Sequence, residues 1–209
     1  MAQFDWKSLL TEFSLKLIQY DMEISSQLRN NGSIIEARIT PKLRESRWLG
    51  YAGATDEQII KAETRLGIQF PPSYREFLKV SNGWRNSDWT DLQLWSTEEV
   101  NWFSTNNQDW IDGWKSKEDC TIPTVPDERY FVYGEAQDCI YLRCEYLQNA
   151  LEISSDSGDG DIFLLNPNVV FENGEWEAWH FGSKLPGASR YRSFYELMLK
   201  VVEQGSFIY

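Results

Sequence analysis

Residues 53–84 read GATDEQIIKAETRLGIQFPPSYREFLKVSNGW and contain two helix signatures in succession. Thr55 begins a capping box, because its hydroxyl can accept from the backbone N–H of Gln58 while the Gln58 side chain reaches back to the Thr55 backbone. Gly67 can end that helix in the left-handed conformation. The proline pair at residues 71–72 sets the start of a second helix, since a proline in the first turn removes no needed hydrogen bond. The stretch therefore predicts two consecutive short helices.

The chain before this block predicts one long helix. Apolar residues recur at steps of three and four from Phe4 to Leu28, which is the spacing of an amphipathic helix of about six turns. The run at residues 30–32, Asn-Asn-Gly, is expected to end it, and the isoleucines within residues 34–39 predict a short strand. We interpret residues 1–49 as a helical N-terminal extension and residues 50–209 as the main domain.

After residue 84 the pattern changes to short strands separated by turns. Asn173-Gly174 is a strong hairpin signal, and the run of aspartate and glycine at residues 156–160 indicates another tight turn. Strands this close in sequence are expected to pair antiparallel. The expected strands cover residues 92–95, 130–133, 139–143, 150–154, 162–165, 169–171 and 175–181.

The rest of this half predicts a short helix, a loop and a closing helix. Residues 97–103 predict an N-cap followed by a short helix. The polar residues 104–129, interrupted by glycine and proline, predict a long loop. Ser193 and Glu196 form another capping box, and the helix that they begin is expected to end at Gly205. Together these elements predict an α+β fold with two N-terminal helices, a largely antiparallel multi-stranded sheet and a C-terminal helix.

The composition is that of a soluble globular protein. Of the 209 residues, 42% are hydrophobic and 25% are charged, which are ordinary values. The net charge of −12 argues against direct binding of nucleic acid, which depends on clustered lysine and arginine. No window is apolar enough for a transmembrane helix, and the first residues lack the pattern of a signal peptide. Three cysteines are too few, and odd in number, for a disulfide framework, which fits a reducing cytoplasm.

The residue patterns of common enzyme sites are missing or wrongly spaced. His180 is the one histidine and cannot build a multi-histidine zinc site. The Asp156–Asp161 cluster places glycines where a calcium loop needs oxygen ligands. No serine stands in a Gly-x-Ser-x-Gly elbow, and no phosphate-binding glycine loop opens a helix. A cysteine nucleophile is not favoured either, because the sequence has no second histidine to act as its base. We therefore predict no enzyme activity, no cofactor and no metal.

Sugar binding stays open as an alternative. Six of the ten tryptophans fall between Trp84 and Trp114, in a region of the kind that often stacks on sugars. With 32 acidic residues, a glycosidase-like carboxylate pair could also be drawn. The competing explanation is that these rings pack against the sheet, since tryptophan is amphipathic and commonly lies at the edge of a core.

Acidic residues are concentrated in the second half of the chain. Residues 85–180 hold 20 acidic and 5 basic residues, a net charge of −15. Solubility alone can explain such an excess, but aromatic anchors among acids are also what a protein-binding face needs. We predict a basic protein partner. The predicted binding face consists of Asp88, Trp89, Asp91, Trp102, Asp109, Trp110, Asp112, Trp114, Asp156, Asp159 and Glu172.

The block at residues 53–84 resembles the opening of the SUKH superfamily. The shared pattern is a helix ending in Glu-x-x-Leu-Gly, then a proline and a tyrosine, a second helix ending in Phe-Leu, and Asn-Gly. Weaker likenesses at residues 157–165, 175–179 and 193–197 extend the resemblance to about residues 50–203. The residues that carry the main pattern are Glu63, Leu66, Gly67, Pro72, Tyr74, Phe77, Leu78, Asn82 and Gly83.

The resemblance implies an α+β fold without catalysis. Bacterial members of the superfamily are typically immunity proteins that bind and neutralise a cognate toxin, often a nuclease, and eukaryotic relatives include yeast cell-wall assembly regulators. Nucleases are usually basic, so the acidic half of this chain agrees with that function. We expect a cytoplasmic immunity protein, monomeric or homodimeric, that neutralises a polymorphic toxin by stoichiometric protein-protein binding. The alternatives are a regulatory scaffold of the cell-wall assembly regulator type and a carbohydrate-binding protein.

Overall fold

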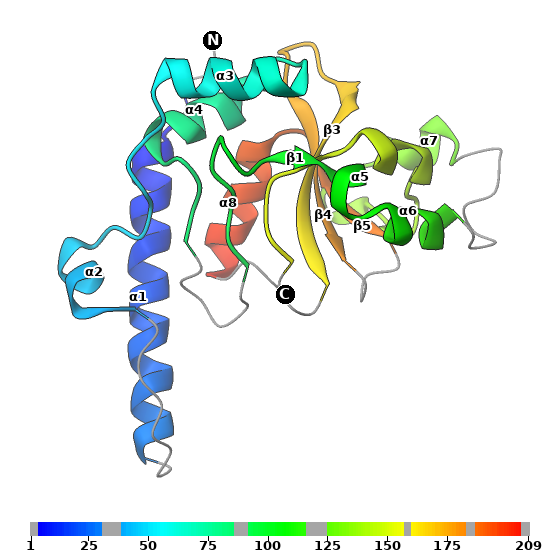
Figure 1. Ribbon diagram of the computed structural model, residues 1–209. Helices are drawn as coiled ribbons and strands as arrows, with labels where there is room; N and C mark the ends of the chain where they lie inside the picture. The colour runs from blue at the N-terminus through cyan, green and yellow to red at the C-terminus, as the bar shows by residue number, and fades with distance from the viewer. Residues whose placement is uncertain are drawn as a thin grey trace.

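A sheet lies between two layers of helices in this protein (Figure 1). The computed structural model describes residues 4–30, 39–85, 92–115, 125–156, 160–182 and 187–205. Within these residues the sheet has five strands, all paired antiparallel with their neighbours in the chain. The α+β fold predicted from the sequence is therefore confirmed.

The sheet is built around one long hairpin. Its two strands meet at the predicted Asn173-Gly174 turn, where Gly174 has a φ of 82°, a conformation that favours glycine. The register between them shifts between Asn166 and Val170. The strands are β1 (Asn101–Trp102), β2 (Leu151–Glu152), β3 (Asp161–Val170), β4 (Trp176–Gly182) and β5 (Ala188–Tyr191).

Both faces of this sheet are buried. Side chains alternate along a strand, so Phe163 and Leu165 of β3 join one hydrophobic cluster while Ile162 and Leu164 join another. The first cluster, here called the main core, lies under the long helices. The second, the covering-layer core, lies under the short ones. A sheet covered on both sides needs apolar residues at consecutive positions, and this explains the run at residues 162–165.

The long helices follow the sequence signals closely. Both hydrogen bonds of the capping box at Thr55 are present. The Thr55 hydroxyl accepts from the Gln58 N–H, and the Gln58 side chain accepts from the Thr55 N–H. At Ser193 the box is half formed, because the Glu196 carboxylate accepts from the Arg192 N–H instead of the Ser193 N–H. These helices are α1 (Trp6–Asn30), α3 (Asp56–Leu66), α4 (Pro72–Val80) and α8 (Phe194–Gln204).

The first helix shares the main core with the rest of the chain. Trp6, Leu10 and Phe13 of α1 are fully buried. The Trp6 ring lies 5.5 Å from Phe194 of α8, and the Phe13 ring stacks 5.7 Å from Trp84. The segment that we interpreted as an extension therefore supplies part of the core.

Helix α4 is capped by the β3–β4 hairpin. Pro71 at the cap position offers no side-chain hydrogen bond, and Pro72 has no N–H to donate. The first free N–H, that of Ser73, donates to the buried Glu175 carboxylate at 2.8 Å, and the Ser73 hydroxyl donates to it at 2.6 Å. A residue 102 positions away thus satisfies the start of the helix.

The second face of the sheet is covered by short helices that the sequence did not reveal. Residues 130–133 and 139–143, expected as strands, lie outside the sheet, and much of the expected loop at 104–129 is helical. These residues, 103–115 and 125–149, are here called the covering layer. It contains α5 (Phe103–Asn106), α6 (Gln108–Lys115), α7 (Asp127–Tyr130) and two 3₁₀ turns, η2 (Gly134–Ala136) and η3 (Cys144–Asn149).

Several smaller expectations are corrected as well. Residues 97–103 form a turn, β1 and the start of α5 instead of one short helix. Within residues 92–95 only Leu94 pairs, through isolated bridges to Trp84 and Ser154. Helix α2 (Pro41–Ser46) and strand β5 were not expected. The strand expected within residues 34–39 falls almost wholly outside the described residues.

Two cysteines fall in the described parts of the chain. Cys139 is a free thiol, whereas the buried Cys144 is disulfide-bonded. A structural disulfide is unusual in a reducing cytoplasm, so it does not support the compartment inferred from cysteine number. Among the described helices, none combines the length and apolar character that crossing a membrane requires.

Candidate functional site

The tryptophans predicted as anchors pack against the protein itself. Trp114 on α6 is 6% exposed and lies 5.3 Å from the Phe181 ring in the covering-layer core. Trp114 is a member of the predicted binding face, but its ring fills the space between α6 and the sheet. Trp110 is half-buried against Phe103 and Phe181, and Trp102 is half-buried against the main core.

The predicted acidic residues do not form one patch. Asp109 and Asp112 are exposed on α6. Asp156 lies before the start of β3 and Glu172 lies after its end, so the length of that strand, about 30 Å, separates them. Both are exposed. The remaining members of the predicted face, Asp88, Trp89, Asp91 and Asp159, lie outside the described residues.

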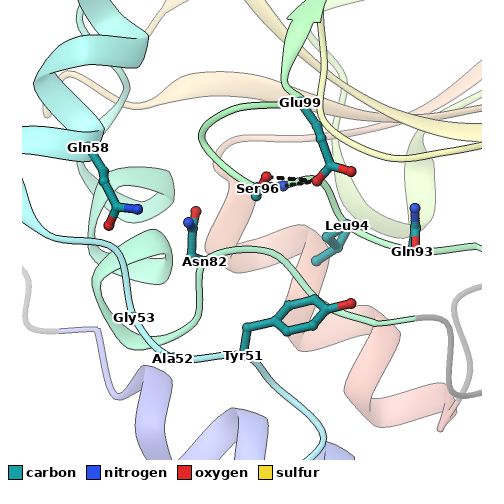
Figure 2. A pocket seen from close by; sticks show the side chains of 9 residues that line it. All are labelled: Tyr51, Ala52, Gly53, Gln58, Asn82, Gln93, Leu94, Ser96 and Glu99. Atoms are coloured by element: carbon teal, nitrogen blue, oxygen red, sulfur yellow. Dashed lines mark hydrogen bonds between the residues drawn. The ribbon is translucent and has the colours of Figure 1, made fainter.

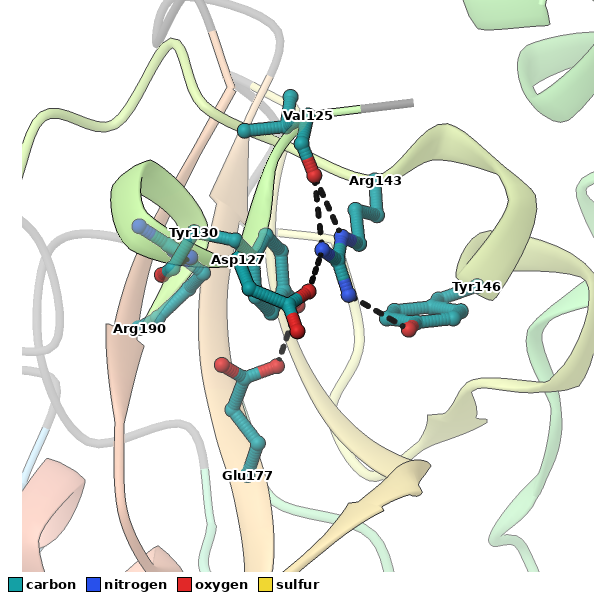
Figure 3. A network of polar contacts seen from close by, with 7 residues as sticks. All are labelled: Val125, Asp127, Tyr130, Arg143, Tyr146, Glu177 and Arg190. Carbon is teal, nitrogen blue, oxygen red and sulfur yellow. Dashed lines mark hydrogen bonds and ion pairs between the residues drawn. The ribbon is translucent and has the colours of Figure 1, made fainter. Parts of the chain in front are cut away.

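A buried carboxylate ties the covering layer to the sheet (Figure 3). Glu177 on β4 is fully buried and accepts hydrogen bonds from the Tyr130 hydroxyl at 2.6 Å and the Tyr133 hydroxyl at 2.8 Å. It also accepts from Asn166 Nδ2 at 2.9 Å and Trp179 Nε1 at 2.6 Å. Burial and the neighbouring Glu177 charge raise the pKa of both tyrosines. Four donors therefore hold this charge, so it serves as a structural centre.

Two arginines complete the attachment around Tyr130. The Arg190 guanidinium lies 4.3 Å from the centre of the Tyr130 ring, and Nη1 donates to the Tyr130 carbonyl. The Arg143 guanidinium lies 4.5 Å from the same ring and donates to Tyr146 Oη, to the Val125 carbonyl and to Asp127. Figure 3 shows both cations beside this ring. Because cation–π and charge-assisted bonds are among the stronger polar contacts, the layer is held in one arrangement.

The outer surface of this layer combines apolar and acidic side chains. Phe131 is 41% exposed and Ile140 is 50% exposed. Both come from stretches expected as strands, and neither belongs to the predicted binding face. The exposed acids of the same stretch are Asp127, Glu128, Glu135, Asp138 and Glu145. Residues 127–145, excluding the buried ones, are here called the acidic layer surface.

The buried carboxylates of the sheet serve separate structural roles. Glu175 caps α4 and Glu177 holds the covering layer. Glu152 on β2 accepts from Asn107 Nδ2 at 3.0 Å, and burial raises its pKa to about 7. The described residues contain no group of three or more histidine, cysteine, aspartate or glutamate side chains placed to hold a metal ion.

A separate groove opens beside α3 (Figure 2). It has a volume of about 490 Å³, and its lining is polar and apolar in about equal parts. Its lining includes Gly53 and Asn82, which belong to the two-helix stretch at residues 53–84. We call it the amide groove; its lining residues are Tyr51, Ala52, Gly53, Gln58, Asn82, Gln93, Leu94, Ser96 and Glu99.

The glycine and asparagine of the Asn82-Gly83 pair are needed to build this region. Gly83 has a φ of 89°, and a Cβ there would lie 2.7 Å from the Leu94 carbonyl oxygen. The Asn82 side chain accepts from the Thr97 N–H at 2.8 Å. At Gly53 a Cβ would lie 1.9 Å from the Lys79 carbonyl oxygen. These contacts give the three positions structural roles.

Comparison with known proteins identifies the family. The model of the SMI1/KNR4 family (SUKH-1) matches residues 53–199, which include α3, α4, the whole sheet and most of α8. No curated protein matches the chain. Helix α1, which completes the main core, precedes the matched region. Because the match covers well over half of its length, the chain belongs to the SMI1/KNR4 (SUKH-1) family.

Proposed function

We propose that this protein is an immunity protein, which binds a cognate toxin stoichiometrically and performs no bond chemistry itself. Family membership supports a domain of this kind, although the family also includes regulators of the KNR4 type. The observation that carries the proposal is the acidic layer surface, where exposed Phe131 and Ile140 occur among five exposed acids. The same stretch also holds Arg129 and Arg143, so acids outnumber bases by five to two. Apolar anchors among an excess of acidic charge are suited to a basic protein.

The mechanism is occlusion of a basic active site. A nuclease holds phosphate with lysine and arginine, and an acidic surface can pair with the same residues. The network around Glu177 and Arg143 fixes the covering layer before the partner arrives, so little ordering cost is added on binding. The toxin is then blocked without being altered.

The test is co-expression with the toxin encoded beside the gene. The full chain should restore growth and form a complex with that toxin. The double change Phe131→Ala with Ile140→Ala should weaken binding at least about tenfold, because interface anchors of this type each contribute over 1 kcal/mol. Ile60→Ala removes a comparably exposed side chain, 53% exposed, from α3 and should have no effect. Absence of neutralisation by the full chain would remove the proposal.

A regulatory scaffold is the second candidate, since the matching family is named for SMI1 and KNR4. Such a protein would bind intracellular partners with no toxin gene nearby. The tryptophan-rich region that suggested carbohydrate binding packs against the protein itself. Trp84 and Trp114 are buried, and Trp95, Trp102 and Trp110 are partly buried against the two cores. A flat tryptophan fluorescence response to a glycan panel is the expected result.

A further inference from the structure

The amide groove presents hydrogen-bonding groups that the protein does not use (Figure 2). The Gln58 Oε1 atom accepts from the Thr55 N–H at 2.9 Å, and the Asn82 Oδ1 atom accepts from the Thr97 N–H at 2.8 Å. These bonds fix which way each carboxamide points, since the oxygen must face the backbone donor. The NH₂ groups of Gln58 and Asn82 are left as donors, and no described residue accepts from them.

Backbone donors and side-chain acceptors lie along the same groove. Ala52 and Gly53 are exposed, and their N–H groups bond to nothing in the described part of the chain. Glu99 accepts with Oε2 from the Ser96 N–H at 3.0 Å and the Ser96 hydroxyl at 2.7 Å, which leaves Oε1 available. The Gln93 backbone is bonded to Ser155, whereas the described residues make no bond to its side chain.

This arrangement matches the polar groups of an extended polypeptide. A peptide backbone alternates carbonyl acceptors with N–H donors, so fixed amides and one carboxylate can bind both without selecting a sequence. The Glu99 charge favours a lysine or arginine at one position through a charge-assisted bond. The exposed ring of Tyr51 adds an apolar contact at the edge.

A sugar fits the groove less well. Sugar sites rely on an open aromatic face, and none of the described lining residues is a tryptophan. The Tyr51 ring already has the Arg85 guanidinium 4.2 Å from its centre. We infer that the amide groove binds an extended polypeptide segment that carries a basic residue. The inference goes beyond the proposed function, because it assigns a site and a ligand class whatever the activity of the partner protein is.

The probe is a random heptapeptide library displayed on phage and selected against the immobilised full chain. Enriched peptides are synthesised and their affinities measured by fluorescence polarisation. Gln93→Ala removes a side chain without internal bonds, and Glu99→Gln keeps an oxygen for Ser96 but removes the charge. Each should weaken binding about tenfold, the usual effect of losing one good hydrogen bond or charge-assisted contact.

The matched controls are Gln69→Ala and Glu98→Gln. Both residues are exposed, make no hydrogen bond to the described part of the chain and do not line the groove, so affinity should stay within about twofold of the wild type. Enriched peptides should contain lysine or arginine. If no peptide is enriched, or if groove and control variants bind alike, the inference is overturned.

Three further outcomes bear on this inference, and the last two separate it from the proposed function. Binding of an arrayed glycan that is lost in Gln93→Ala would assign the groove to sugars and would contradict the inference. Groove-dependent peptide binding by a chain that neutralises no toxin would support the inference while removing the immunity function. Conversely, toxin neutralisation together with groove-independent peptide binding would keep the function and reject the groove.

Discussion

At the scale of single residues, the molecule depends on carboxylates that are buried but individually bonded. Glu177 has four donors and Glu175 has two. Glu152 has one donor, Asn107, and is 5% exposed. One hydrogen bond does not offset the cost of burying a charge, and burial therefore raises the pKa of Glu152 to about 7.

Glu152 should make stability depend on pH. The folded pKa of Glu152 lies above its unfolded value. Its contribution to the free energy of unfolding is therefore complete below the unfolded pKa and is lost as the pH rises through about 7. Glu152→Gln should match the wild type at about pH 4, below the unfolded pKa, and exceed it at about pH 8 by on the order of 2 kcal/mol in the free energy of unfolding. Urea unfolding at both pH values measures this difference. The exposed Glu145→Gln serves as control, and an equal gain in both variants would rule out burial as the cause.

At the scale of elements, α4 depends on a cap from the β3–β4 hairpin, 102 positions further along the chain. Glu175→Ala removes the acceptor of the Ser73 N–H and hydroxyl and should destabilise the fold by about 1–3 kcal/mol, the cost of leaving buried donors unpaired. Thermal unfolding measures the loss. Glu172→Ala, an exposed change in the same hairpin, should have little effect. Equal melting temperatures for the two variants would contradict the capping role.

Helix α1 should belong to the same folding unit as the family-matched region. Phe13→Ala empties a fully buried site beside Trp84 and should cost about 3–5 kcal/mol. Leu15→Ala, on the exposed face of the same helix, should cost far less. Circular dichroism and tryptophan fluorescence should report one shared unfolding transition for Phe13→Ala. Loss of α1 in a separate, earlier transition would show it to be an appendage.

The elements that hydrogen bonds within a few residues specify were predictable. The elements that form through contact with the sheet were not. Thr55, Gln58 and Gly67 signal a helix by bonds within a few residues, as Asn173-Gly174 signals a turn. The covering layer has no such signal, because its helices span one or two turns and periodicity needs a longer window. Tyr130 and Tyr133 resemble strand residues, yet their hydroxyls reach Glu177 on a strand over forty positions away.

The candidate site was predictable in charge but not in position. The acidic excess of residues 85–180 is visible in the sequence. The sequence could not show that Trp114 faces inward or that Asp156 and Glu172 stand at opposite ends of β3, because both depend on which face of the sheet each segment covers. Phe131 and Ile140 were missed for the same reason. Their exposure follows from Tyr130 and Leu142 filling the inner side of the layer.

At the scale of the whole molecule, an acidic protein should approach a basic partner under electrostatic guidance. The chain has a net charge of −12, and charge complementarity acts mainly on the association rate. We expect the association rate constant with the toxin to fall by about tenfold or more as salt rises from low to physiological concentration, while the dissociation rate changes little. Stopped-flow mixing measures both. A rate constant independent of salt would remove the role assigned to the acidic residues.

The most direct test of the central claim is a titration of the neighbouring gene's toxin with the full chain, followed by toxin activity. The account predicts that activity falls linearly and reaches zero at a fixed, stoichiometric ratio, and that intact toxin is recovered when the complex is separated. Inactivation by a small fraction of an equivalent, or toxin recovered in a chemically altered form, would show that the protein acts as an enzyme and would contradict the account.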